Sequence, residues 1–172
     1  MKRYQKMAAL FSIVWMVMIF CFSAQSSDDS GEVSGGVTET LVTTANFLFH
    51  WEMDQSAIME LVDKWEGTVR KIAHATEFFL LTMGLFLWLD CRGWTIWKHL
   101  WIAGCIAVGY AVSDEFHQLF VPGRAGRIGD VGVDSIGVLV ALLLMVGVRV
   151  CISSLWKKDK SVGIESSSQE KM

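Results

Sequence analysis

Apolar residues along this chain are gathered into four long runs that polar segments of unequal length separate. Residues 7–24 form the first run, which follows three basic residues, and residues 72–89 form the second. The third and fourth runs, 100–113 and 136–148, are shorter. Crossing a hydrocarbon core of about 30 Å takes roughly twenty apolar residues in a helix. The first two runs are therefore long enough to span a bilayer. The last two reach this length only if their helices extend into the polar segment between them.

Extending the third and fourth helices in this way places charged residues within the membrane. The predicted spans are about 7–24, 72–89, 100–120 and 131–149. Asp114, Glu115 and Gln118 then lie inside the third span, and Asp134 lies about one turn inside the fourth. A charged side chain costs roughly 2.5–3.5 kcal/mol at the bilayer centre and commonly marks a functional site. These acids are therefore the first candidates for a site.

The basic residues orient the spans. No Lys or Arg occurs in residues 25–51, whereas basic residues lie between the second and third spans and after the fourth. Because Lys and Arg are retained on the cytoplasmic side, we expect an all-α polytopic membrane protein with four transmembrane helices and both termini cytoplasmic. These spans make one domain over residues 7–150, in which residues 25–71 form an outer loop. A tail at 151–172, rich in Ser, Lys and Glu, is expected to be cytoplasmic and disordered.

Within the outer loop, apolar residues recur at helical spacing over residues 58–69. The pattern predicts a short amphipathic helix. Two interpretations stay open: this helix lies in the outer membrane interface, or it packs as a lid over the bundle.

Composition agrees with a membrane location. The chain has 172 residues, of which 52% are hydrophobic, with eight Trp and one Pro. Its net charge of −3 gives no indication of a nucleic-acid partner. The four cysteines are isolated, and neither a CxxC nor an HExxH pattern occurs, so we expect no disulfide, metal or cofactor. The lipid bilayer is the expected partner, and the sequence does not indicate an oligomeric state.

The topology brings polar residues of three spans to one outer depth. Lys71, His74 and Glu77 follow one another at intervals of three and share a helix face. Asp114 with Gln118, and Asp130 with Asp134, are each four apart and share faces in the same way. The predicted ligand-binding residues are Lys71, His74, Glu77, Asp114, Glu115, Gln118, Arg124, Asp130 and Asp134. The candidates for a catalytic role are His74, Glu77, Asp114 and Asp134.

Two interpretations of this cluster compete. Its acids and bases are nearly balanced, which indicates ion pairing, and Arg124 is the expected bidentate partner of a carboxylate such as Asp114. The cluster could therefore be a salt-bridge network that holds three helices together. Buried ion pairs, however, seldom stabilise a protein more than apolar residues would. This favours a binding site.

Three motifs resemble those of the VanZ-like family of bacterial integral membrane proteins. They are RKIAHATEF at 70–78, SDEFHQLFVPGR at 113–124 and DVGVDSIG at 130–137. The resemblance implies a multi-pass protein of the bacterial cytoplasmic membrane with the charged motifs as its functional core. It also implies a link to antibiotic resistance, since the family is named after a protein associated with low-level teicoplanin resistance. It implies no reaction. The sequence departs from the family pattern at Phe78, where Tyr is common, and in its longer acidic outer loop.

Three functions follow as hypotheses. In the first, the charged pocket binds or shields a lipid headgroup, a lipid-linked envelope precursor or an amphiphilic antibiotic. In the second, the protein is a membrane-embedded enzyme that acts on such a substrate by acid–base or metal-assisted chemistry, with His74 as base or ligand. The third, a proton-coupled transporter, is disfavoured because the cytoplasmic halves of the spans carry no polar path.

Overall fold

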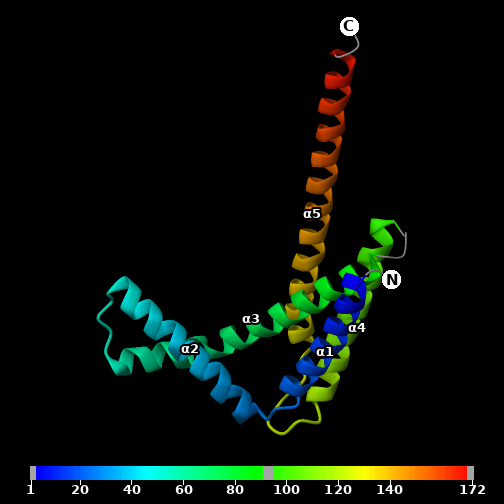
Figure 1. Ribbon diagram of the computed structural model, residues 1–172. Coiled ribbons are helices and arrows are strands. Elements are labelled where there is room, and N and C mark those ends of the chain that lie inside the picture. Colours follow the sequence, from blue (N-terminus) through cyan, green and yellow to red (C-terminus); the bar gives the residue numbers. More distant parts are fainter. Residues whose placement is uncertain (1–2, 91–94, 170–172) are drawn as a thin grey trace.

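The computed structural model describes residues 3–90 and 95–169, with side chains up to Ser154, and is helical throughout this part (Figure 1). The helices are α1 (Arg3–Ser23), α2 (Ser27–Phe49), α3 (Gln55–Leu89), α4 (Ile96–Gln118) and α5 (Ile128–Gln169). Four of them, α1, α3, α4 and α5, are long and apolar enough to cross a membrane. The predicted all-α class with four spans is therefore confirmed.

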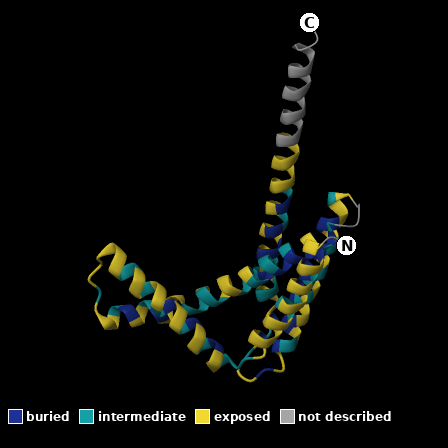
Figure 2. Ribbon diagram, in the orientation of Figure 1, coloured by how far each residue is buried: buried dark blue, intermediate teal, exposed yellow. Residues whose placement is uncertain are grey.

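Many residues on the outside of the spans are exposed (Figure 2), and large apolar residues are among them. Leu10, Ile13 and Leu143 are all more than half exposed, which water would disfavour and lipid tails accept. Phe78 and Leu81 of α3 are fully buried in the core. This distribution is the one expected for helices that face lipid.

Helix α3 is the centre of the molecule and packs against each of the other four helices. Two partly buried polar contacts hold α1 in place, one to α3 and one to α4. The indole Nε1 of Trp15 donates a 2.9 Å hydrogen bond to the carbonyl oxygen of Glu77, and the hydroxyl of Tyr110 donates one of 2.6 Å to that of Met16. An unpaired donor or acceptor costs free energy in an apolar environment. Both hydrogen bonds therefore favour one position of α1.

A close approach between two spans lies at Gly137 of α5. A Cβ atom at this position would overlap the carbonyl oxygen of Ala75 on α3. The absence of a side chain therefore lets the two backbones touch, as small residues do at membrane helix crossings. Ala75 follows His74 and Gly137 lies one turn after Asp134, so this crossing sets the separation of two predicted site residues.

Most of the segment predicted as an outer loop, residues 25–71, forms a helical hairpin, and its location outside the membrane stays a prediction. Residues 27–49 are α2, and α3 begins at Gln55 with Asp54 as its N-cap. The predicted amphipathic helix at 58–69 is helical, but it is the first part of α3, whose 35 residues extend over about 52 Å. The polar composition of α2 hid this helix, because its stability comes from packing on α3 rather than from an apolar run.

Two predictions concern segments that the structure describes only in part, the turn after the second span and the C-terminal tail. The turn expected after the second span lies, beyond Asp90, outside the described residues. The tail expected to be disordered lies almost wholly beyond Ser154, outside the described side chains, and its disorder stays a prediction. At this end of the bundle a guanidinium nitrogen of Arg149 contacts Asp90 Oδ1, so α5 is joined to the end of α3.

Candidate functional site

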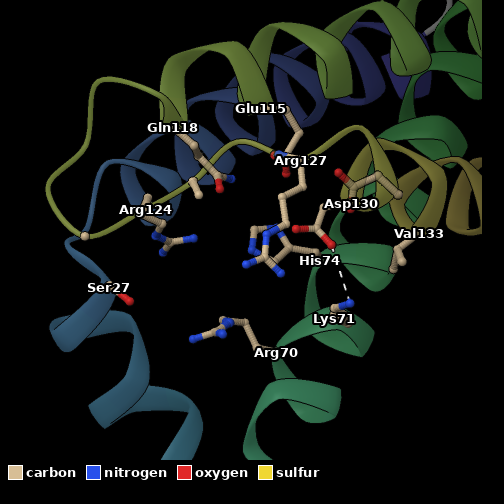
Figure 3. A pocket seen from close by; sticks show the side chains of 13 residues that line it. Ser27, Arg70, Lys71, His74, Glu115, Gln118, Arg124, Arg127, Asp130 and Val133 are labelled. Carbon is tan, nitrogen blue, oxygen red and sulfur yellow. Dashed lines mark hydrogen bonds and ion pairs between the residues drawn. The ribbon is translucent and has the colours of Figure 1, made fainter.

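A cavity of about 210 Å³ lies at the end of the bundle where α1 and α4 end and α5 begins (Figure 3). We call it the polar cavity. Its walls come from the start of α2, the middle of α3, the end of α4, the loop after α4 and the first turns of α5. The lining residues are Ser27, Arg70, Lys71, His74, Glu115, Gln118, Gly123, Arg124, Ala125, Arg127, Asp130, Val133 and Asp134.

Four of these residues are basic, and they reach the polar cavity from two directions. Arg70 and Lys71 extend from α3, whereas Arg124 and Arg127 extend from the loop opposite (Figure 3). The two α3 cations have acidic neighbours: Lys71 Nζ lies 3.6 Å from Asp130 Oδ1, and an Arg70 nitrogen lies 3.8 Å from Glu66 Oε1. Neither pair is close or deeply buried, so each leaves its cation available to a ligand.

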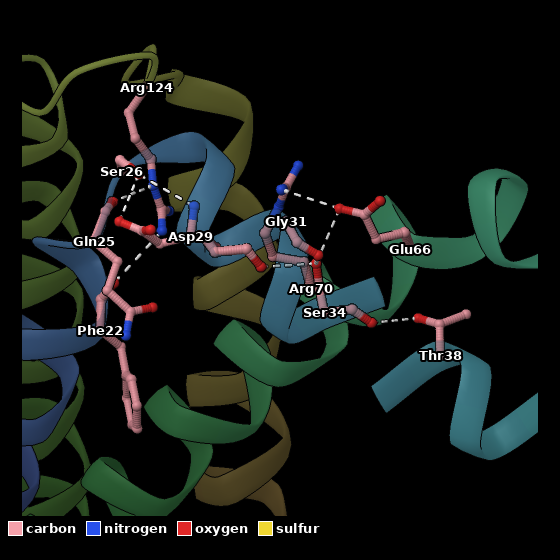
Figure 4. Close-up of polar contacts among 11 residues, drawn as sticks. Phe22, Gln25, Ser26, Asp29, Gly31, Ser34, Thr38, Glu66, Arg70 and Arg124 are labelled. Atoms are coloured by element: carbon pink, nitrogen blue, oxygen red, sulfur yellow. Dashed lines mark hydrogen bonds and ion pairs between the residues drawn. The ribbon is translucent and has the colours of Figure 1, made fainter. Parts of the chain in front are cut away.

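Arg124 is held by backbone atoms rather than by a carboxylate. Its Nε donates a 3.1 Å hydrogen bond to the carbonyl oxygen of Gln25, and Nη2 is 3.5 Å from that of Phe22 (Figure 4). The expected pair between Arg124 and Asp114 does not form. The turn at Gly123, with φ of +74°, directs the guanidinium to the C-terminal end of α1, where backbone carbonyls are unpaired and the helix dipole is negative.

Burial lowers the pKa of Arg124, and the neighbouring charge of Arg70 lowers it further. Arginine nevertheless stays protonated, because its ordinary pKa lies far above neutral pH. A half-buried guanidinium thus keeps its full charge with only neutral backbone acceptors in direct contact.

Arg127 presents a second guanidinium, on a residue that is more exposed than Arg124. Its main-chain N–H donates a 2.9 Å hydrogen bond to Glu115 Oε2, which ties the loop to α4. Its side chain has no hydrogen bond or ion pair within the described part of the chain. Next to it, a Cβ at Gly126 would overlap the carbonyl oxygen of Glu115, so the loop can approach α4 only with glycine there. The backbone of Arg127 is fixed while its charge faces the polar cavity.

Below these cations lies a group of buried acids and one histidine. His74 Nδ1 is 3.6 Å from Glu77 Oε2, too far for a hydrogen bond, and Gln118 Nε2 donates a 3.1 Å bond to Asp114 Oδ2. Several buried side-chain atoms of this group have no hydrogen-bond partner among the described residues. They are His74 Nδ1, Glu77 Oε2, Asp114 Oδ1 and Asp134 Oδ2. Unpaired buried polar atoms are uncommon and require a reason, which a bound ligand or water can supply.

The structure brings most of the predicted ligand-binding residues together. Seven line the polar cavity: Lys71, His74, Glu115, Gln118, Arg124, Asp130 and Asp134. Glu77 and Asp114 do not line it and lie in the layer beneath. Sequence reasoning missed Ser27, because it predicted no helix at residues 27–49. It counted Arg70 among the bases of the cluster but not among the ligand-binding residues.

The donor set of the polar cavity suits an anion better than a cation. No three His, Cys, Asp or Glu side chains in residues 3–90 and 95–154 lie close enough together to hold a metal ion. Planar guanidinium groups instead match the geometry of phosphate and carboxylate oxygens. Whole drug-sized ligands usually occupy about 300–1,000 Å³. A cavity of about 210 Å³ therefore fits one charged group of a larger molecule.

Comparison with known proteins agrees with the family resemblance of the three sequence motifs. The model of the VanZ/LLP1 family matches residues 8–151, a range that includes every residue lining the polar cavity. No curated protein and no solved structure matches the chain significantly.

Proposed function

The chain belongs to the VanZ/LLP1 family, and from this membership and the geometry of the polar cavity we propose that it binds an anionic group at the outer face of the bacterial cytoplasmic membrane. The group belongs to a cell-envelope component, such as a phospholipid or a lipid-linked precursor, or to an amphiphilic antibiotic. Binding shields that molecule or retains it at the membrane, a role of the kind that glycopeptide resistance requires.

The arginines of the loop carry this proposal. Arg124 and Arg127 both line the polar cavity, and neither guanidinium is paired with a carboxylate in the described structure. The neighbouring charge of Arg70 repels that of Arg124, whereas Asp114, Glu115 and Glu77 favour the Arg124 charge without pairing with it directly. An incoming phosphate or carboxylate removes the repulsion and accepts charge-assisted hydrogen bonds, each worth about 1.5–3 kcal/mol.

The acids of the same cavity define what else the ligand carries. Glu115, Asp130 and Asp134 are acceptors beside the cations. Ionised or neutral, they bind hydroxyl or amine donors. A headgroup that combines a phosphate with hydroxyl or amino groups satisfies both sets, which a simple inorganic anion does not. This supports a lipid or glycolipid headgroup as the ligand class.

Lipid co-purification tests the proposal. Protein extracted in mild detergent should retain a stoichiometric anionic lipid, identified by mass spectrometry, and Arg127→Gln should lose most of it. Lys64→Gln is the matched control, because Lys64 is an exposed cation of α3 that does not line the polar cavity. Equal lipid content in all three proteins, together with unchanged susceptibility of a deletion strain to envelope-directed antibiotics, would contradict the proposal.

A membrane-embedded enzyme is the second candidate, and the unpartnered atoms of His74 and Asp134 favour it. Both residues line the polar cavity, and both have buried side-chain atoms without a hydrogen-bond partner among the described residues. His74 is suited to accept a proton from an attacking hydroxyl or water, while Arg124 and Arg127 stabilise the charge that develops on a phosphoryl group.

One variant distinguishes the binding protein from the enzyme. His74→Gln keeps the four cations, so a binding protein should retain its lipid and its phenotype. An enzyme should retain the lipid, lose the phenotype and accumulate unconverted substrate in the envelope. Loss of lipid in this variant would indicate that His74 itself binds the ligand, in agreement with its place among the predicted ligand-binding residues.

A further inference from the structure

Helix α2 is polar on the face that it packs and apolar on the face that it exposes. Ser30, Ser34 and Thr38 are buried against α3, and the hydroxyl of Ser34 donates a 3.0 Å hydrogen bond to Glu66 Oε1 (Figure 4). Val33, Val37 and Leu41, one helical turn apart, are 58%, 48% and 56% exposed. A helix in water shows the opposite arrangement. We call these three residues, with Leu48 two turns further on, the α2 stripe.

Three acidic residues of α2 lie on a different side of the helix from the α2 stripe, whereas Asp29 lies in the first turn of α2, one turn before Val33. Asp28, Glu32 and Glu39 are separated by four and seven residues and therefore share their own face. The helix thus presents three sides: a small polar side toward α3, an acidic side and an apolar side. An apolar side opposite a charged side, in a helix of low overall hydropathy that is not among the candidate spans, is typical of a helix lying along a membrane surface.

The tip of the hairpin continues the apolar surface. Phe47, Leu48, Phe49 and Trp51 are all more than half exposed, and the rings of Phe49 and Trp51 stack with centroids 5.4 Å apart. Aromatic rings concentrate where lipid tails meet headgroups, because they combine an apolar body with polarity at one edge. Four adjacent large apolar side chains would be a costly surface in water.

The direction of the hairpin places these residues beside the spans. Helix α2 starts at the end of α1 that borders the polar cavity and then turns back, so that the hairpin tip lies beside the bundle and not beyond its end (Figure 1). In a bilayer that surrounds α1, α4 and α5, a projection in this direction meets lipid.

We propose that the α2–α3 hairpin rests in the outer leaflet, with the α2 stripe and the aromatic tip in contact with lipid tails and the acidic side turned to water. The occupant of this surface is bilayer lipid. Two features favour lipid over a second copy of the chain. The apolar surface ends in exposed aromatics, and the hairpin continues directly into a membrane span through α3.

Photo-crosslinking to lipid tests this contact on the intact chain. Wild-type protein in vesicles of phosphatidylcholine that contain a lipid with a photoreactive group in its acyl chain should give adducts on residues 33–51. Peptide mass spectrometry should locate them on Val37, Leu41 and the tip, and not on Glu32 or Glu39. Val37→Glu should reduce adducts on α2 several-fold, because a charge is costly in contact with lipid tails.

Thr43→Glu is the matched control, since it adds the same charge at an exposed position away from the α2 stripe and should leave the adducts unchanged. Adducts confined to the four spans, in wild-type protein that has the helical content of all five helices, would overturn the proposal. Crosslinks between copies through Val37 in place of lipid adducts would also overturn it. Neither result depends on the polar cavity, so failure here is distinguishable from failure of the proposed binding function.

Discussion

Arg124 donates a hydrogen bond of 3.1 Å from its Nε to the carbonyl oxygen of Gln25, a residue ninety-nine positions earlier in the chain. This bond joins the loop after α4 to the end of α1. It also orients a cation of the polar cavity without neutralising it, because the acceptor carries no net charge. One side chain therefore has a structural role and, in the proposed function, a binding role, and substitutions can separate the two.

Replacing Arg124 by Lys should retain the charge and lose the oriented hydrogen bonds. Lysine has no planar fork, so it cannot reach the carbonyls of Gln25 and Phe22 together. We expect a loss of about 1 kcal/mol in the free energy of unfolding, as for one intramolecular hydrogen bond. Thermal unfolding in detergent measures this. Arg127→Lys is the control and should leave stability unchanged, since the Arg127 side chain makes no bond in the described structure.

Replacing Gly137 by Ala should separate α3 from α5. The added methyl group would overlap the carbonyl oxygen of Ala75, so one backbone must move, and overpacking of this kind typically costs about 1–3 kcal/mol. Ligand binding should weaken in parallel, because His74 and Asp134 flank this crossing. Gly132→Ala, at a position of α5 with open space around it, is the comparison and should be neutral or slightly stabilising. Equal effects of the two substitutions on the midpoint of unfolding would refute the close crossing.

The pair formed by Lys71 and Asp130 should contribute little to stability. Its atoms are 3.6 Å apart and Lys71 is exposed, and such pairs are commonly worth about 0.2–1 kcal/mol. A double-mutant cycle with Lys71→Gln and Asp130→Asn measures the coupling energy, which should fall as salt is added. A coupling well above this range that salt does not change would support the alternative in which the cluster mainly holds the helices together.

Asp54 should give the start of α3 a dependence on pH. The N–H of Ala57 and the hydroxyl of Ser56 lower the pKa of the Asp54 carboxyl by hydrogen bonding to it. A lowered pKa means that the cap stabilises α3 above the ordinary value of about 4, and that this stabilisation is lost as the pH falls through the lower value of the folded state. The amide resonance of Ala57 should titrate below the ordinary Asp pKa. In Asp54→Asn, which still caps, that resonance should not titrate.

Much of the fold and the site follows from the sequence because both are consequences of span length. The runs ending before Asp114 and beginning after Asp134 are too short to cross a bilayer, which fixes these acids inside the membrane-spanning helices. The pairing of side chains does not follow in the same way. The guanidinium of Arg124 contacts backbone carbonyls and not Asp114, because the turn at Gly123 directs it to the end of α1. The spacing of residues in the sequence does not predict that direction.

Helix α2 could not be predicted from the pattern of apolar residues either. Ser30, Ser34 and Thr38 occupy the packed face of α2, so a search for apolar residues on a buried face finds none there. The apolar residues that do recur with helical spacing, such as Val33 and Val37, point away from the protein. Only the tertiary contact with α3 identifies which face is which.

The most direct test of the central claim is a calorimetric titration of short-chain phosphatidylglycerol, whose headgroup carries a phosphate and hydroxyl groups, into the detergent-solubilised protein. The account predicts saturable binding that weakens with salt, a loss of about tenfold or more in Arg127→Gln, and no change in Lys64→Gln. Binding of equal affinity in all three proteins, or no binding by the wild-type chain, would contradict an anion site in the polar cavity.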